Sequence, residues 1–485
     1  MGKPFGTLIR FQSERTILIG TVLSLSAVSA VTVFVLSQYL SVDALSSLVF
    51  IPDDCYLDGG VKVGRHCFSD YTLPVSFGLR ANPWEPFPVH LQAGVKLASS
   101  NYPAAGLVPL VIFGVLGKWI GSPQIGLVGY LMALTIAVLT PAAWAAHGAR
   151  GIERIVVFIA CGVAAVPAWM AVDRGNSAGF LVPIALAFLV ALARQRWILV
   201  AVFVVLAAMV KPQFALLVIV LFAARQWRWG GAALAGILVS NMAAYLLWPR
   251  DFPQTITQSA RSIAGYGDNS FEALVTHLNV SFGKALLAVP DGLKAQETGG
   301  KIPDGFLAGP RTLIGYVIVL LVVASVVVLG RRIPPVMVGI VLLATAALFP
   351  ALSFPYYLVF VLPVAALVVR DPNGPPGAGI FDQLASVGDR RRAVGLSVTL
   401  AVALSIAHIA LPGPPMHVGN TTGQLGAVES ASRAVVHTTA FLAPILWLIA
   451  CVAIIVSYAR RPAPLVANDA SPAPQVEAPA TQPAT

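Results

Sequence analysis

Long apolar runs separated by short polar segments dominate the chain. Many of these runs are long enough to cross a bilayer as a helix, which takes about 20 residues. A helix satisfies its own backbone hydrogen bonds inside lipid, so such runs predict membrane helices. The pattern therefore predicts an all-α polytopic membrane protein whose transmembrane domain spans residues 1–461. The thirteen apolar blocks are 16–40, 104–119, 124–146, 153–172, 177–193, 197–210, 213–224, 230–248, 311–330, 334–352, 354–370, 393–411 and 436–458.

Composition narrows the function classes. Of the 485 residues, 57% are hydrophobic and 11% are charged, whereas soluble domains carry about 25% charged residues. A soluble enzyme, a disordered protein and a disulfide-framework domain are excluded. The net charge of +10 does not indicate nucleic-acid binding here, because the basic residues cluster at the ends of apolar blocks. We expect membrane lipids as partners and no nucleic acid.

These basic clusters predict the topology, since cytoplasmic loops are enriched in Lys and Arg. Arg10 and Arg15 place the N-terminus in the cytoplasm, and Arg460 and Arg461 place the C-terminus there. Two cytoplasmic ends require an even number of crossings. The short, proline-containing block 104–119 is therefore read as re-entrant or shallow, which leaves about twelve transmembrane helices in the plasma membrane. Thirteen crossings remain the alternative.

Three loops then lie on the extracytoplasmic face, at 41–103, 249–310 and 412–435, the first being large and rich in polar residues. The Pro/Ala-rich segment 462–485 carries few bulky residues and predicts a disordered cytoplasmic tail.

Motifs typical of other reaction classes are either absent or in the wrong structural context. The segment 175–179 matches G-x-S-x-G, but it opens a membrane helix instead of the strand-to-helix turn that a serine nucleophile requires. No H-E-x-x-H, Walker A or C-x-x-C motif occurs. We therefore expect no metal and no cofactor.

The first loop concentrates the candidate chemistry. Cys55 and Cys67 form a plausible disulfide in an oxidising compartment, and two free thiols are the alternative. Such a bridge would hold Asp58 and Asp70 near one rigid loop. Farther along the chain stand an Asn-Pro-Trp step ending at Trp84 and the sequence Asn101-Tyr102-Pro103.

This order of features resembles the GT-C superfamily of membrane glycosyltransferases, and most closely its actinobacterial branch that uses polyprenyl-phosphate mannose or arabinofuranose. The segments Asp173-Arg174-Gly175-Asn176 and Lys211-Pro212-Gln213 add to the likeness. It covers roughly residues 16–250. One departure is Ala104, which follows Tyr-Pro where the family usually has a second proline.

The resemblance implies a GT-C-like bundle that catalyses inverting sugar transfer. The donor is a polyprenyl-phosphate sugar, and the acceptor is a cell-envelope glycan or glycolipid used in wall biogenesis. A carboxylate takes the proton of the acceptor hydroxyl, and cations hold the leaving phosphate. Asp70 is the first candidate for the base and Asp58 the second. A surface aspartate without a role remains the alternative for Asp70.

Lys211 interrupts an apolar stretch near the predicted outer interface. A charge there is expensive unless it is paired or faces a cavity, so we expect it to bind the donor phosphate, with snorkelling to the lipid headgroups as the alternative. Three more cations are candidates on the same face: Arg80, Arg174 and Arg261.

Candidate substrate-binding side chains occur in the first two loops. Amides and imidazoles suit sugar hydroxyls, and aromatic rings suit sugar faces. The segment 266–271 resembles a Gly-Asn-x-Ser step of the same branch, although a polar turn explains it equally well. The six candidates are Trp84, Asn101, Tyr102, Tyr266, Asn269 and His277.

The competing function is a transporter or flippase for a lipid-linked saccharide. Such a protein usually carries ionisable residues near the membrane midplane and related halves. Here the predicted midplane is almost bare of charge and no internal repeat is evident. The sequence therefore favours the enzyme over the transporter.

Overall fold

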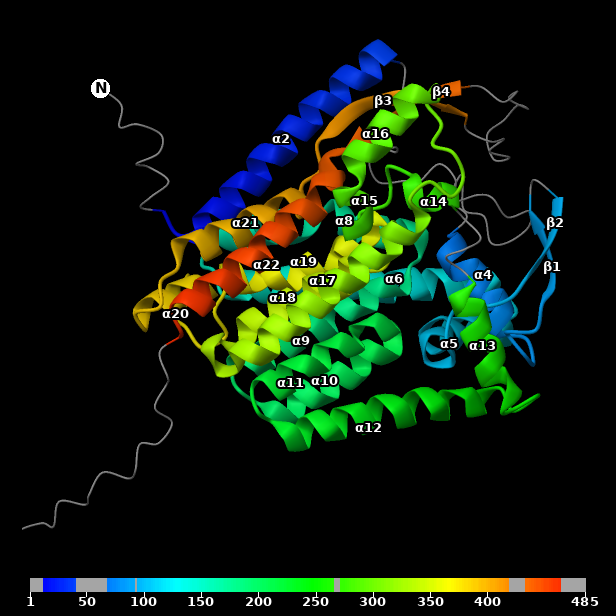
Figure 1. Cartoon of the computed structure of the whole chain (residues 1–485), viewed down its shortest axis with the longest axis horizontal. Coiled ribbons are helices and arrows are strands. Elements are labelled where there is room, and N and C mark those ends of the chain that lie inside the picture. Colours follow the sequence, from blue (N-terminus) through cyan, green and yellow to red (C-terminus); the bar gives the residue numbers. More distant parts are fainter. Residues whose placement is uncertain (1–11, 41–67, 92–93, 266–270, 418–431, 464–485) are drawn as a thin grey trace, which may run out of the picture.

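The computed structural model describes residues 12–40, 68–91, 94–265, 271–417 and 432–463 (Figure 1). Within these ranges each of the thirteen apolar blocks is occupied by a helix. Five helical spans are long and apolar enough to cross a membrane. They are α2 (Glu14–Leu40), α6 (Pro123–His147), α12 with η5 (Trp227–Ala244, Tyr245–Leu247), α17 with η6 (Ala308–Leu329, Gly330–Arg332) and η8 with α22 (Thr439–Leu442, Ala443–Arg460).

A further apolar helix pair is bent and forms either a broken span or a re-entrant loop. It runs through α7 (Glu153–Phe158), the π-helical η2 (Ile159–Val163) and α8 (Val166–Arg174), with a bend of 49°. Seven apolar helical segments are shorter. They are α5 (Ala104–Ile120), η3–α9 (Ser177–Phe180, Leu181–Ala193), α10 (Trp197–Val210), η4–α11 (Pro212–Val218, Ile219–Ala223), α18 (Pro335–Leu348), η7–α19 (Pro355–Phe360, Val361–Val369) and α21 (Arg392–Ile406).

These short segments leave the number of crossings open. The 14 residues of α10 extend about 21 Å, whereas the hydrocarbon core of a bilayer is about 30 Å thick. A membrane protein with several apolar transmembrane helices is confirmed. The twelve crossings and the shallow insertion of residues 104–119 stay predictions.

The predicted outer loops carry small elements of their own. The helices there are α4 (Ser69–Gly78), α13 (Gln254–Ala264), α14 (Phe271–Val275), α15 (Phe282–Leu286) and α16 (Ala288–Glu297), and α20 (Ile380–Ser386) lies elsewhere, in the predicted cytoplasmic segment. The expected all-α fold is supplemented by two antiparallel hairpins, β1 (Phe87–Leu91) with β2 (Gly94–Ala98) and β3 (Ala410–His417) with β4 (Ser432–Thr438).

Side-chain contacts join the first two predicted outer loops to each other and the second to strand β4. The first and second are linked by Asn82, which donates to Gln258, and by a 2.9 Å hydrogen bond between Ser99 and Ser262. The rings of His277 and His437 stack at 4.1 Å and link the second loop to strand β4, at a position two residues beyond the predicted third loop. In Figure 1, α20 lies at the opposite side of the bundle from α4, α13 and the β1–β2 hairpin. Which end faces the cytoplasm stays a prediction.

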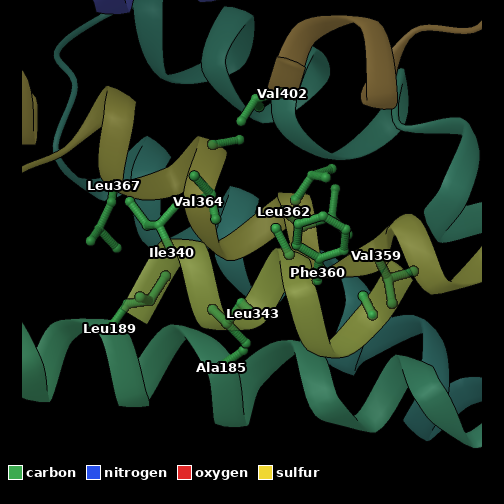
Figure 2. Close-up of a cluster of buried hydrophobic side chains, with 14 of the residues drawn as sticks. Ala185, Leu189, Ile340, Leu343, Val359, Phe360, Leu362, Val364, Leu367 and Val402 are labelled. Carbon is green, nitrogen blue, oxygen red and sulfur yellow. The ribbon is translucent and has the colours of Figure 1, made fainter. Parts of the chain in front are cut away.

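The centre of the bundle is apolar on all sides. Every residue of α19 is buried, as is every residue of α18 after its first proline. Figure 2 shows side chains of these helices packed between α9 and α21, with Leu343 near Ala185. Other helices instead expose large apolar residues, such as Phe34 of α2 at 65% and Leu320 of α17 at 67%. Apolar surface of this kind belongs against lipid.

Candidate active site

Asp70 lies in the first turn of α4. The turn begins after Phe68, whose φ of 48° is left-handed and whose carbonyl oxygen accepts from the backbone N–H groups of Tyr71 and Thr72. A carboxylate in the first helical turn interacts favourably with the unpaired N–H groups there. The helix packs against α5 and α8, so Asp70 is brought to the C-terminal end of α8.

The end of α8 supplies the partners of this carboxylate. Nη2 of Arg174 lies 3.2 Å from Oδ1 of Asp70, and its Nε donates to Oδ2 at 3.4 Å. The side-chain amide of Asn176 donates to Oδ2 at 2.8 Å, while its own oxygen accepts from the backbone of Ala178. The Asp70 side chain is 17% exposed. Both carboxylate oxygens are therefore oriented while the group stays accessible.

Gly175 makes this junction possible. It ends α8 at φ 65°, the left-handed region that glycine adopts without strain. A Cβ at this position would come within 2.9 Å of the Cβ of Tyr71. The hydroxyl of Tyr130 donates to the Gly175 carbonyl oxygen at 2.9 Å. The close approach of α4 and α8 explains why a glycine separates Arg174 from Asn176.

Lys211 lies at a second helix junction. Helix α10 ends at Val210, and Pro212 begins η4, so the break prevents Lys211 from continuing either helix. The residue is 6% exposed. Its Nζ donates to the hydroxyl of Tyr102 at 3.3 Å and lies 4.4 Å from the centre of that ring. Among the described residues no carboxylate forms an ion pair with it. A buried ammonium held by an aromatic ring is suited to an anionic ligand.

Tyrosines connect the two junctions. The charges of Lys211 and Asp70 both act on the Tyr102 hydroxyl, and burial raises the pKa of that hydroxyl to about 12. Tyr356 and Tyr357 of η7 also interact electrostatically with Asp70, and Gln213 acts on the Tyr357 hydroxyl. Lys211 lies 5.6 Å from the Tyr357 ring. Asp70, Arg174 and Lys211 therefore lie in one region with three tyrosines, Tyr102, Tyr356 and Tyr357, which we call the tyrosine wall.

Trp84 holds Tyr102 of the tyrosine wall in place from the protein interior. Its side chain is 1% exposed and packs against Tyr245 and Trp248. Its indole N–H donates to the carbonyl oxygen of Tyr102 at 2.9 Å. Trp84 was predicted to bind a sugar face. That role stays a prediction, and the observed contacts are those of a core residue that positions Tyr102.

The other described candidates make contacts that do not involve Asp70. Arg80 donates to the carbonyl oxygen of Glu85 and covers the Phe87 ring. Arg261 is exposed on α13, and Asn101 is partly exposed beside Tyr102. His277 stacks on His437. Five predicted residues lie outside the described ranges: Asp58, the disulfide candidates Cys55 and Cys67, and the sugar-binding candidates Tyr266 and Asn269.

Sequence reasoning missed Asn176, Gln213 and the tyrosine pair at 356–357 as site residues. The signals are modest. Asn176 and Gln213 each stand close to a cation already singled out, and the tyrosine pair opens an otherwise apolar block. In the parts of the chain that the structure covers, no group of three His, Cys, Asp or Glu residues has a metal-binding arrangement.

Comparison with known proteins gives one match. Residues 101–335 match the family model of glycosyltransferase family 87. This match indicates a glycosyltransferase and supports a membrane enzyme of GT-C type. It includes Tyr102, Arg174 and Lys211 and begins after Asp70. No curated protein and no solved structure matches the chain.

Proposed function

We propose that this protein is an inverting glycosyltransferase that moves a mannosyl or arabinofuranosyl residue from a polyprenyl-phosphate donor. The acceptor is a glycan or glycolipid of the cell envelope, and transfer takes place on the outer face of the plasma membrane. The carrying observation is the oriented Asp70 carboxylate in one region with Lys211, a buried cation without a carboxylate partner among the described residues.

The roles follow from charge and access. Asp70 accepts the proton of the acceptor hydroxyl, and that oxygen forms the new bond to the anomeric carbon of the sugar. The bond from this carbon to the phosphate oxygen breaks on the opposite face, which inverts the configuration. Polyprenyl phosphate leaves with the bonding electrons, and Lys211 neutralises its charge. A general base in such a step contributes about 10²–10⁴-fold in rate.

Arg174 has two functions in this mechanism. Its Nη2 and Nε groups hold Asp70, and its charge also acts on Tyr356. A guanidinium presents its donors in a rigid fork that orients a carboxylate, and its positive charge attracts the donor phosphate. Asp58, which lies outside the described residues, is the alternative base.

The test is sugar transfer by purified protein in lipid nanodiscs. Radiolabelled polyprenyl-phosphate mannose and arabinofuranose are compared with nucleotide sugars, each with a panel of glycan and glycolipid acceptors. We expect transfer from a polyprenyl-phosphate donor, with NMR of the product showing the inverted anomeric configuration. Transfer only from nucleotide sugars contradicts the proposed polyprenyl-phosphate donor. Movement of lipid-linked saccharide across proteoliposome membranes without any product instead favours the transporter.

A further inference from the structure

A cavity of about 520 Å³ lies far from Asp70. Trp197, the first residue of α10, lines it, whereas Lys211 follows the last residue of the same helix. The two sites therefore lie at opposite ends of α10, about 20 Å apart. We call this space the turn cavity, because residues of three interhelical turns line it: Gln195, Gln226 and Arg331.

Two of these turns share an unusual backbone. Gln195 between α9 and α10 has φ 52°, and Arg225 between α11 and α12 has φ 58°. Both turns close with a backbone hydrogen bond that spans five residues, from Arg196 to Ala191 and from Gln226 to Leu221. Glycine is the usual residue at such left-handed positions. Gln195 itself and Gln226, the residue after Arg225, place two amides on the wall of one cavity.

The charge available to a ligand in the turn cavity is positive. The side chain of Arg331 is exposed and makes no hydrogen bond or ion pair to any described residue. The one lining carboxylate, Asp389, is already engaged, since it is 1% exposed and binds Arg391 at 2.8 Å and Tyr458 at 3.0 Å. An adjoining hollow of about 690 Å³ shares Gln195 and adds Arg194 and Arg196. A guanidinium beside neutral amide donors suits a phosphate group.

The remaining walls indicate an amphiphile. Trp197, Val338 and Leu384 give the cavity an apolar side. The flanking helices α12 and α17 expose Trp227 at 64% and Val328 at 82%, the latter three residues before Arg331. A phosphate can contact Arg331 while its hydrocarbon chains follow these apolar surfaces. A soluble phosphate would not use them.

We infer that the turn cavity binds the headgroup of an anionic membrane phospholipid. The inference does not depend on the proposed reaction, since none of the candidate site residues lines this cavity. The lipid phosphate contacts Arg331, and the amides of Gln195 and Gln226 donate to the headgroup. Bound lipid then bridges the three turns.

Native mass spectrometry of the full-length protein tests this inference, with phosphatidylglycerol and phosphatidylcholine as probes. Both lipids offer a phosphate to Arg331, but the trimethylammonium group of phosphatidylcholine repels the guanidinium and cannot hydrogen-bond to the two amides, whereas the glycerol hydroxyls of phosphatidylglycerol can. Phosphatidylglycerol should therefore bind about tenfold more tightly. Arg331→Gln should remove most of this preference. Gln226→Glu, which keeps the side-chain shape and adds a negative charge, should also weaken phosphatidylglycerol binding. The matched control is Arg228→Gln, an exposed arginine that does not line the cavity, and it should leave binding unchanged.

Thermal melting of each variant establishes that it is folded before binding is compared. Equal affinity for both lipids contradicts the inference, as does unchanged phosphatidylglycerol binding in both cavity variants. Full displacement of the lipid by millimolar glycerol phosphate shows a site for a soluble phosphate and also overturns the lipid assignment.

Discussion

Two carboxylates, Asp70 and Asp291, each bind an arginine from another helix, but they differ in how accessible they remain to a ligand. Asp291 of α16 receives hydrogen bonds from Lys284 at 2.8 Å and from both terminal nitrogens of Arg311 in α17. Its side chain is 4% exposed, and that of Arg311 is 1% exposed. Asp70 is 17% exposed and is held by one arginine and one amide.

Each region also contains a lysine, and the two lysines differ in whether they bind the carboxylate. Lys284 binds the carboxylate that Arg311 already binds, so this cluster is closed by protein groups. Lys211 contacts a phenol hydroxyl and aromatic rings. Burial alone raises the pKa of Asp291, but the hydrogen bonds from Arg311 and Lys284 overcome this and hold its pKa below the ordinary value. The Asp291 cluster, in which every charge is paired within the protein, stabilises the fold. The region of Asp70 and Lys211 can still bind a ligand.

The largest expected effect is on turnover in Asp70→Asn. Asparagine keeps the shape of the side chain but cannot accept the acceptor proton, so the rate should fall by about 10²–10⁴-fold. Donor binding should change little. Turnover with a radiolabelled polyprenyl-phosphate sugar and a separate donor-binding measurement check this. Asp58→Asn is the matched control. If it loses turnover while Asp70→Asn remains near normal, the base is Asp58.

The next effect is on donor affinity in Lys211→Met, which keeps the length of the side chain and removes its charge. A hydrogen bond to a charged group contributes about 1.5–3 kcal/mol, which corresponds to about 10–100-fold in affinity. Turnover should fall as well, because the phosphate gains charge as it leaves. Lys211→Arg should recover part of the binding. Lys118→Met, an exposed lysine on α5, is the control, and an equal loss in both variants would refute the role of Lys211.

Asp291→Asn should affect stability instead of chemistry. Removing one partner of a buried ion pair leaves its cations uncompensated and costs about 3–5 kcal/mol. We expect a lower unfolding midpoint in detergent micelles, with turnover per folded molecule unchanged. The exposed Asp304 provides a control, Asp304→Asn, that should not shift the midpoint. If Asp291→Asn lost turnover while its unfolding midpoint stayed unchanged, Asp291 would take part in catalysis and the distinction from Asp70 would be wrong.

The smallest effect concerns pH and the stacked histidines near Lys284. Burial, His437 and Lys284 lower the pKa of His277 to about 4, from an ordinary value of 6.5. Between these pH values the unfolded chain binds a proton that the folded protein does not, so stability falls as pH decreases from about 6.5 to about 4. Melting midpoints at pH 7 and pH 5 should differ less in His277→Gln than in the wild type. An unchanged difference excludes His277 as the source.

Much of this molecule could be predicted from local sequence. The thirteen apolar blocks correspond to helices because hydrophobicity over one segment is a property of that segment alone. Lys211 stood out for the same reason, since one charge in an apolar run is visible without knowing its neighbours. Asp70 and Arg174 became candidates through motif resemblance. The role of Trp84 was harder to predict, because an aromatic residue in a loop looks the same whether it faces a sugar or the core.

The tertiary structure decided which of these residues meet. Asp70 and Arg174 are 104 positions apart, and their pairing depends on how α4 packs on the end of α8. The sequence could not indicate such neighbours, because central helices such as α18 and α19 are apolar on every side and so carry no amphipathic face that identifies a partner. The sequence by itself determined the membrane helices and the residue types available for chemistry. Helix packing determined that Asp291 is closed by two cations, while Asp70 and Lys211 remain able to bind a ligand.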